Sequence, residues 1–228
     1  MALLIPKVFH QIWLGSKPIP GKFREWAERW VALNPGWRVE WWTDERLPAL
    51  VNRKEFEGAD KMAAKSDILR YEICWKQGGI YVDSDVEPLR PIGELLEGVN
   101  AFYGDERPDT PCNAILGCAA GDGFFEHLVK KLPESFRGEG DIVDKTGPRF
   151  LKRELEGFLG EKRRYEWDYG MKRRLRVSSE DGARQVFGFD WRVFYPYYYT
   201  EPQREWDEYP EAYGRHHWTA SWWKDGGV

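Results

Sequence analysis

The stretch of residues 66–85 constrains the fold more than any other part of the chain, because it combines a helical pattern, a glycine pair and a short apolar run. Apolar residues in its first half recur at helical spacing. Gly78 and Gly79 follow, and glycine readily adopts the positive φ that ends a helix. The apolar run 80–82 then favours a short strand. The stretch therefore predicts a helix, a tight turn and a buried strand in direct succession.

Charged residues occupy defined positions on this predicted helix and strand. Asp83 and Asp85 are two residues apart, so the strand period places both carboxylates on one side where the strand ends. Hard divalent cations prefer such oxygen ligands. Asp67, Arg70 and Tyr71 share one helical face, where a carboxylate suited to hydroxyl groups lies beside a guanidinium suited to phosphate. The pattern predicts a site for a metal-bound diphosphate. The alternatives are a solvated turn for the aspartates and a surface ion pair on the helix.

Strand patterns and helix patterns alternate along the chain, which predicts an α/β sheet. Ligands of such sheets gather at the carboxyl ends of the strands, where Asp83 and Asp85 fall. The stretch 195–199 is aromatic, contains a proline and is not expected to be a regular helix. Further strands are expected at 7–13, 39–43, 101–103 and 114–116, and further helices at 23–33, near Asp122 and near Thr146, with Thr146 as an N-cap.

Composition indicates a single domain without a membrane-spanning segment. The 228 residues are 42% hydrophobic, which is enough for one sizeable core. No apolar run approaches the length that crosses a bilayer, and the N-terminus lacks the pattern of a cleaved signal, so a cytoplasmic protein is expected. A net charge of −4 lacks the basic excess of a nucleic-acid binder. The three cysteines have no paired metal spacing and are expected to be reduced and mostly buried.

Several motifs together resemble glycosyltransferase family 32, which includes initiating mannosyltransferases and bacterial capsular polysaccharide transferases. The chain is also similar to the clostridial glucosylating toxins. The matching stretches are 5–15, 34–37, 66–85, 113–117, 146–148, 216–218 and 221–222. These enzymes share the GT-A fold. The resemblance therefore implies a GT-A-like (Rossmann-like) mixed sheet flanked by helices, in one domain that spans residues 1–228.

The resemblance also implies roles for individual residues. Asp83 and Asp85 would be the catalytic aspartates and would bind a metal ion, while Asp67 would meet sugar hydroxyls and Arg70 the sugar or the diphosphate. Trp13 matches a position where the toxins stack a tryptophan on uracil, and the alternative for Trp13 is a place in the core. The full set implied to bind the nucleotide sugar is Gln11, Trp13, Asp67, Arg70, Tyr71, Asn113, Thr146, Ser221 and Trp222.

The C-terminal part of the chain offers a further metal ligand. GT-A enzymes often bring a final ligand back to the metal from this region, and a neutral imidazole can coordinate such a cation. The related pattern His-x-Trp favours His216, two residues before Trp218. His217 and a purely structural hydrogen bond remain alternatives. Ser221 and Trp222 are expected to close over the diphosphate. Asn113 and Thr146 resemble positions near the point of sugar transfer, with a turn contact and a helix cap as their respective alternatives.

These features together predict a metal-dependent glycosyltransferase. It would move a hexose from a UDP- or GDP-sugar to a glycan or lipid-linked saccharide, with Mn²⁺ or Mg²⁺ bridging the diphosphate. The resemblance implies retention of the anomeric configuration, and no residue is identified as a covalent nucleophile. Two other readings stay open. Paired aspartates also serve phosphoryl and nucleotidyl transferases, and a transferase scaffold can persist in a non-catalytic carbohydrate-binding protein.

A basic segment stands out in this acidic chain. Residues 162–165 and 172–174 are rich in lysine and arginine, and Trp167 and Tyr169 lie between them. One hypothesis places the segment near the acceptor entrance, where it would attract anionic lipid or glycan and allow peripheral contact with the inner face of a membrane. The alternative is a solvated face.

Overall fold

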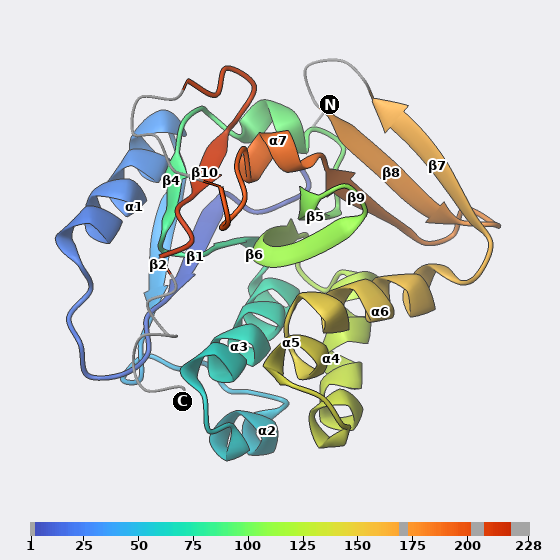
Figure 1. The fold of residues 1–228 in the computed structure, drawn as a ribbon, viewed down its shortest axis with the longest axis horizontal. Helices are drawn as coiled ribbons and strands as arrows, with labels where there is room; N and C mark the ends of the chain where they lie inside the picture. Colours follow the sequence, from blue (N-terminus) through green and yellow to red (C-terminus); the bar gives the residue numbers. More distant parts are fainter. Residues whose placement is uncertain (1–2, 169–172, 202–207, 220–228) are drawn as a thin grey trace.

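The protein is an α/β structure built on one large mixed sheet. A computed structural model describes residues 3–168, 173–201 and 208–219. Within these residues, eight strands form a sheet in the order β2-β1-β3-β6-β5-β9-β8-β7, and β4 pairs with β10 in a separate two-stranded sheet (Figure 1). The strands are β1 (Val8–Ile12), β2 (Arg38–Trp42), β3 (Gly79–Val82), β4 (Val86–Pro88), β5 (Ala101–Arg107), β6 (Thr110–Cys118), β7 (Arg163–Asp168), β8 (Arg174–Ser179), β9 (Gln185–Phe189) and β10 (Gly214–His216).

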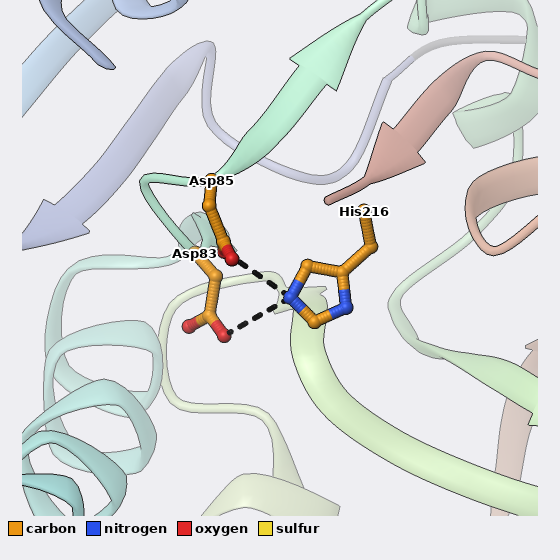
Figure 2. A group of neighbouring side chains, drawn as sticks. All are labelled: Asp83, Asp85 and His216. Carbon is orange, nitrogen blue, oxygen red and sulfur yellow. Dashed lines mark hydrogen bonds and ion pairs between the residues drawn. The ribbon is translucent and has the colours of Figure 1, made fainter. Parts of the chain in front are cut away.

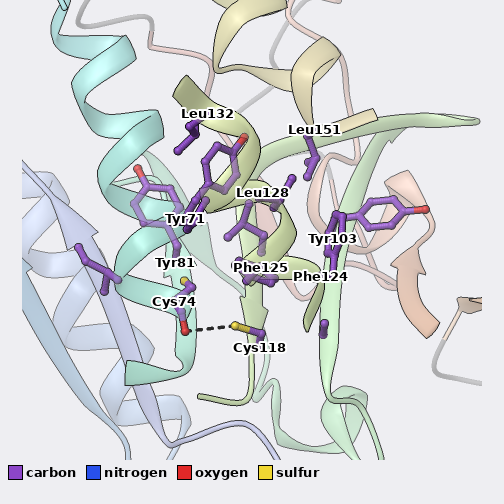
Figure 3. Packing of buried hydrophobic residues seen from close by; sticks show 14 of the residues in the cluster. Tyr71, Cys74, Tyr81, Tyr103, Cys118, Phe124, Phe125, Leu128, Leu132 and Leu151 are labelled. Carbon is purple, nitrogen blue, oxygen red and sulfur yellow. Dashed lines mark hydrogen bonds between the residues drawn. The ribbon is translucent and has the colours of Figure 1, made fainter. Parts of the chain in front are cut away.

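Helices cover both faces of the sheet. Residues of α2, α3, α4 and α6 share one apolar cluster with one face of the sheet, shown in Figure 3, whereas residues of α1, α7 and the 3₁₀ turn η1 share a second cluster with the other face. The helical segments are α1 (Gly21–Leu33), α2 (Arg53–Gly58), α3 (Met62–Gln77), η1 (Gly93–Leu96), α4 (Gly123–Arg137), α5 (Ile142–Lys145), α6 (Pro148–Leu159) and α7 (Trp191–Phe194). None of the described helices is long and apolar enough to span a bilayer.

The expected α/β architecture is confirmed, and the sheet is mixed as the resemblance implied. Strand β1 is parallel to β2 and β3, while β3 and β5 are both antiparallel to β6. All five residues of β1 are buried, because neighbours flank it on both sides and helices cover both faces. The predicted helix, turn and strand of residues 66–85 appear as α3, Gly78 and β3.

Two expectations about helix starts had different outcomes. Asp122 is the N-cap of α4, and its carboxylate accepts hydrogen bonds from the backbone N–H groups of Phe124 and Phe125. Thr146 is not the N-cap of α6, because that helix starts one residue later with Gly147 as its cap. Thr146 instead ends α5, and its hydroxyl donates to the Asp67 carboxylate. The position of the α6 start therefore leaves Thr146 outside the cap, where its side chain contacts α3 instead.

The glycine pair joins α3 to β3 by fitting closely against β1. Gly78 and Gly79 have φ values of 66° and 105°, a region that side-chain-bearing residues rarely adopt. The backbone oxygen of Gly78 lies 2.8 Å from Nε2 of His10, and Trp42 donates to the Nδ1 atom of the same ring at 3.2 Å. Since Nδ1 accepts, the proton lies on Nε2 and the ring is neutral. Burial lowers the pKa of His10, in agreement with that tautomer.

Replacing Gly79 with alanine is expected to destabilise the protein by about 3 kcal/mol, from the left-handed backbone and from overpacking together. A Cβ atom there would come within 2.5 Å of Cγ1 of Val8 and 2.8 Å of the His10 ring. Gly93→Ala is the matched control, because nothing lies within 4 Å of its added Cβ. Urea unfolding of both variants tests the expectation, and equal midpoints would contradict it.

Candidate functional site

Three predicted metal ligands converge at the end of β3. Asp83 and Asp85 follow that strand directly, and His216 comes from β10, which pairs with β4 so that His216 lies opposite Val86. One ligand atom from each of the three residues lies within 4.8 Å of the others. Nε2 of His216 is 3.1 Å from Oδ1 of Asp85 and 3.9 Å from Oδ2 of Asp83 (Figure 2). Asp85 and His216 are buried, with 9% and 7% of their surfaces exposed.

Each of the two carboxylates is anchored through one of its own oxygens, and its other oxygen faces the imidazole of His216. Oδ2 of Asp85 accepts hydrogen bonds from the backbone N–H and the hydroxyl of Thr219, both at 2.9 Å. Oδ1 of Asp83 accepts from the Tyr81 hydroxyl at 2.5 Å and lies 3.4 Å from Nη1 of Arg70. These contacts fix the carboxylates without occupying Oδ1 of Asp85 or Oδ2 of Asp83. The arrangement matches the outer-shell bonding that orients metal ligands.

The charges of Asp83, Asp85 and His216 shift one another's pKa values. Burial would raise the pKa of Asp85, but the charge and hydrogen bond of His216, together with Thr219, hold that pKa well below its usual value. Burial raises the pKa of Asp83, and the Arg70 guanidinium offsets this only in part. Burial would lower the pKa of His216, yet the two aspartates outweigh it and raise that pKa. A cation at this position is therefore favoured over an empty pair of buried carboxylates.

The structure separates the two neighbouring histidines. His217 does not point toward the aspartates. Its Nε2 atom is 2.9 Å from Oε2 of Glu87, and its ring stacks on Trp26 at a centroid distance of 4.5 Å. Glu87 also accepts from Arg215. Glu87 of β4 thus contacts Arg215 and His217 on the face of the β4–β10 pair opposite His216. Of the two histidines, His216 is the one whose ring faces the aspartates.

A second, buried polar network adjoins the aspartates. The Asp67 carboxylate accepts from Nδ2 of Asn113 and from the hydroxyl of Thr146, both at 2.8 Å. Arg70 lies 3.2 Å from Asp67 and donates to the backbone oxygen of Asn113 at 2.6 Å. The Tyr71 hydroxyl donates to the backbone oxygen of Thr146 at 2.9 Å. The five residues come from α3, β6 and the loop before α6, and the structure brings all of them together.

An irregularity in β6 delivers Asn113 to this network. Tyr103 of β5 pairs with Leu116, but the next residue, Gly104, pairs with Cys112. Residues 113–115 are therefore extra on β6, and such a bulge turns side chains out of the regular alternation. The backbone oxygen of Ala114 in the same bulge accepts from the N–H of Asp83 at 2.7 Å. The same bulge thus positions Asn113 in the Asp67 network and holds the backbone of Asp83.

The remaining predicted residues have mixed outcomes. Trp13 is half-buried just beyond β1, where its indole N–H donates to the backbone oxygen of Lys17 at 2.7 Å and its ring meets Phe23 edge-on. Gln11 is fully buried in β1, and neither amide atom has a hydrogen-bond partner in the part of the chain that the structure describes. Neither residue contacts the aspartates or the Asp67 network in any described hydrogen bond. Ser221 and Trp222 lie outside the described residues.

Two residues of the site were not anticipated from the sequence. Tyr81 is two residues before Asp83, so the strand period could have placed it on the same side. Its ring also lies under the Arg70 guanidinium at 4.3 Å, a cation–π contact that holds the cation between both carboxylates. Thr219 carries no comparable signal, because its contact with Asp85 joins positions far apart in the chain.

The basic segment is not part of this site. Its strands β7 and β8 form the end of the sheet, with β9 and β5 between them and β6. Most of its described arginines face carboxylates. The ion pairs of the segment are Lys162–Glu180, Arg163–Glu156, Arg173–Glu211 and Arg174–Asp168. Its positive charge is therefore largely neutralised within the protein.

Sequence comparison assigns the central part of the chain to a known family. Residues 20–103 match the family described as "Glycosyltransferase sugar-binding region containing DXD motif". An uncharacterised glycosyltransferase of Acanthamoeba polyphaga mimivirus is 26% identical over 161 residues, which cover 65% of this chain and 64% of the relative. Inositol phosphoceramide mannosyltransferase 3 of Schizosaccharomyces pombe is 29% identical over 157 residues, covering 64% of this chain and 44% of the relative. The chain thus spans less than two thirds of each.

A solved structure supports the same assignment at the level of the fold. The PaToxG glycosyltransferase superposes with a TM-score of 0.57 at 18% identity, covering 67% of this chain and 68% of that one. Asp67, Arg70, Asp83 and Asp85 all fall inside the matched sugar-binding region. Residues 20–103 are therefore similar to the sugar-binding region of glycosyltransferases that contain a DXD motif, and the chain has a GT-A-like fold.

Proposed function

We propose that the protein is a metal-dependent glycosyltransferase that moves a hexose from a nucleotide-diphosphate sugar to a glycan or lipid-linked saccharide. The observation that carries this proposal is the convergence of Asp83, Asp85 and His216 beside the buried Asp67–Arg70 pair. The first group suits a cation on a diphosphate, and the second offers donors and acceptors for a sugar. Because the two groups share Arg70 as a neighbour, one nucleotide sugar can contact both.

The donor set fits a hard or borderline divalent cation. Oδ2 of Asp83, Oδ1 of Asp85 and Nε2 of His216 would hold it, since these atoms face one another while the opposite carboxylate oxygens are anchored elsewhere. Two carboxylates with one imidazole suit Mn²⁺ or Mg²⁺. When bound, such an ion neutralises the charge that develops on the departing nucleoside diphosphate.

The Asp67 network is proposed to position the hexose. Asn113 and Thr146 hold the Asp67 carboxylate in one orientation. A carboxylate accepts about four hydrogen bonds, so Asp67 retains capacity for sugar hydroxyls. The Arg70 guanidinium carries a fixed charge at the boundary between sugar and diphosphate. Burial favours such a preorganised arrangement because no water has to be rearranged during transfer.

The donor and the stereochemistry are also part of the proposal. The yeast relatives are named for mannosyl transfer, which makes GDP-mannose the first donor to test, with UDP-hexoses beside it. Retention of configuration, by front-face attack of the acceptor hydroxyl, is the expected course. Trp13 for the base, and Ser221 and Trp222 for the diphosphate, remain predicted contacts.

A donor screen discriminates this proposal from its alternatives. Purified protein is incubated with Mn²⁺ and a set of GDP- and UDP-hexoses, and thermal shift is read together with release of nucleoside diphosphate. A sugar transferase releases GDP or UDP by slow hydrolysis even without acceptor. Release of phosphate or pyrophosphate would indicate a phosphoryl or nucleotidyl transferase. A thermal shift with sugars alone and no release would indicate a non-catalytic binding protein.

Asp85→Asn is expected to remove turnover while leaving the fold intact. The amide keeps the shape of the side chain and its contact with Thr219, but it deletes the charge that faces the cation. The loss is on the order of 3 kcal/mol in the transition state, or more than a hundredfold in rate. Asp83→Asn should be similarly severe. Release of nucleoside diphosphate at saturating Mn²⁺ is the measurement.

Asp60→Asn serves as the matched control, because Asp60 is exposed and lies outside the site. Melting curves must accompany all the variants, so that loss of the fold is not mistaken for loss of chemistry. Near wild-type transfer by folded Asp85→Asn, or by chelated wild-type enzyme, would show that the proposal is wrong.

His216→Ala is expected to weaken Mn²⁺ binding at least about tenfold and to be partly rescued by excess Mn²⁺, because water can take the vacated position. Asp85→Asn should not be rescued. His217→Ala is the control, since its ring contacts Glu87 and Trp26 instead. Mn²⁺ titrations followed by electron paramagnetic resonance measure the affinity without requiring turnover. If the two histidine variants bind Mn²⁺ equally well, His216 is not a ligand.

A further inference from the structure

Three aromatic rings contact one another beside the candidate metal site, in tilted and edge-on arrangements. Tyr198, Tyr199 and Trp218 make up this aromatic shelf, with ring centroids 4.2 Å apart for the two tyrosines. Trp218 lies 5.8 Å from Tyr198 and 5.9 Å from Tyr199. Tyr199 is 61% exposed, whereas the other two rings are half-buried. The exposed Tyr199 ring is not isolated, because it lies at the end of a packed series of rings that begins at His216.

The shelf is directly connected to the metal centre. The ring of Trp218 lies 4.1 Å from that of His216, and the next residue, Thr219, holds the Asp85 carboxylate. Trp218 itself has a φ of 51°, in the left-handed region that few non-glycine residues adopt. Such strain is maintained only where surrounding contacts require it. The series His216, Trp218, Tyr199 therefore leads from the site of the leaving group to the protein surface.

Polar groups from β5 flank the same rings. The Arg107 guanidinium lies over the Tyr198 ring at 4.6 Å and is ion-paired with Glu201. Glu106 is the extra residue of a bulge, because Asp105 pairs with Pro111 and Arg107 pairs with Thr110. Its side chain is half-buried, and it lies between Asp105 and Arg107, the residue whose guanidinium covers the Tyr198 ring. A bulge of this kind commonly redirects a side chain next to an active site.

We propose that the aromatic shelf and Glu106 form the acceptor subsite and that this subsite binds a neutral pyranose ring. The inference rests on the proposed function and deepens it. The C–H face of a pyranose packs on exposed aromatic rings, and a carboxylate accepts its hydroxyl groups. The ring would pack on Tyr199 and Trp218, beside His216 and therefore next to the proposed donor site.

The charges around the shelf select a neutral acceptor over an anionic one. Among the described residues, Arg107 lies over the Tyr198 ring, and Glu201 pairs with it. Glu106 adds a negative charge for which the described residues offer no ion-pair partner, whereas the proposed cation would offset Asp83 and Asp85. An acceptor with a phosphate or carboxylate at this position would meet like charge in a partly dehydrated place. The terminal sugar at the shelf is accordingly uncharged.

Tyr199→Ala tests the shelf because the side chain is exposed and its removal should not unfold the protein. With a panel of methyl hexopyranosides as acceptors, the variant is expected to raise the acceptor KM about tenfold, the magnitude of one lost stacking contact. KM for the nucleotide sugar should change less than twofold. Tyr199→Phe retains the ring and should restore the acceptor KM. Tyr165→Ala is the matched control, because Tyr165 is 56% exposed on β7, away from the site.

The panel also contains the uronate counterpart of each hexopyranoside, and saturation-transfer NMR measures binding to the wild-type protein without turnover. Better use of the uronates than of the neutral sugars would overturn the charge argument. An unchanged acceptor KM in Tyr199→Ala, or an equal change in Tyr165→Ala, would overturn the shelf. The acceptor subsite would also be overturned if no pyranoside bound or reacted. Transfer of the sugar to protein side chains and to no pyranoside would overturn it too. Absence of nucleoside-diphosphate release with any donor is a separate result that refutes the proposed function itself.

Discussion

The Arg70 guanidinium is the interaction on which the site depends. It is buried, yet it lies 3.2 Å from Asp67 and 3.4 Å from Asp83, and it donates to the backbone of Asn113. A buried guanidinium is tolerated only when its charge and its donors are matched, so helix α3, the end of β3 and the bulge of β6 must adopt one relative position. Removing Arg70 would take this counter-charge away from the buried Asp67 and the half-buried Asp83. The same cation that fixes the structure also faces the proposed donor site.

A second constraint is that the proposed metal ligands come from distant parts of the chain. Asp83 and Asp85 belong to a local helix–turn–strand unit, whereas His216 arrives through the pairing of β10 with β4. The Glu87 contacts with Arg215 and His217 stabilise that pairing from the other side. Assembly of the complete site therefore requires the closure of a long loop, which is costly in chain entropy. The local half of the site can form before the C-terminal half is in place.

This division explains what the sequence could predict. The α/β class, the unit of residues 66–85 and the helix start near Asp122 follow from local patterns and were confirmed. Asn113 and Thr146 were implied only by resemblance, because a bulge and a loop bring them to Asp67. The cap assigned to Thr146 was wrong, because α6 is capped by Gly147, and the Thr146 hydroxyl instead contacts the distant Asp67 carboxylate. Thr219 and the strands β7 and β8 were missed because their contacts are non-local or resemble those of a charged surface segment.

Residues of the proposed donor site are easier to predict from the sequence than residues of the proposed acceptor subsite. The donor side needs carboxylates and a guanidinium at fixed spacing on regular elements, so it leaves a pattern in the sequence. The acceptor side is built from Tyr198 and Tyr199, from Trp218, and from the bulged Glu106, none of which follows a period. An aromatic run after a helix is equally typical of core packing, and only the 4.1 Å contact between Trp218 and His216 separates the two interpretations. Chemistry common to a family can be encoded in a local motif, whereas the surface that selects an acceptor depends on how distant segments are packed together.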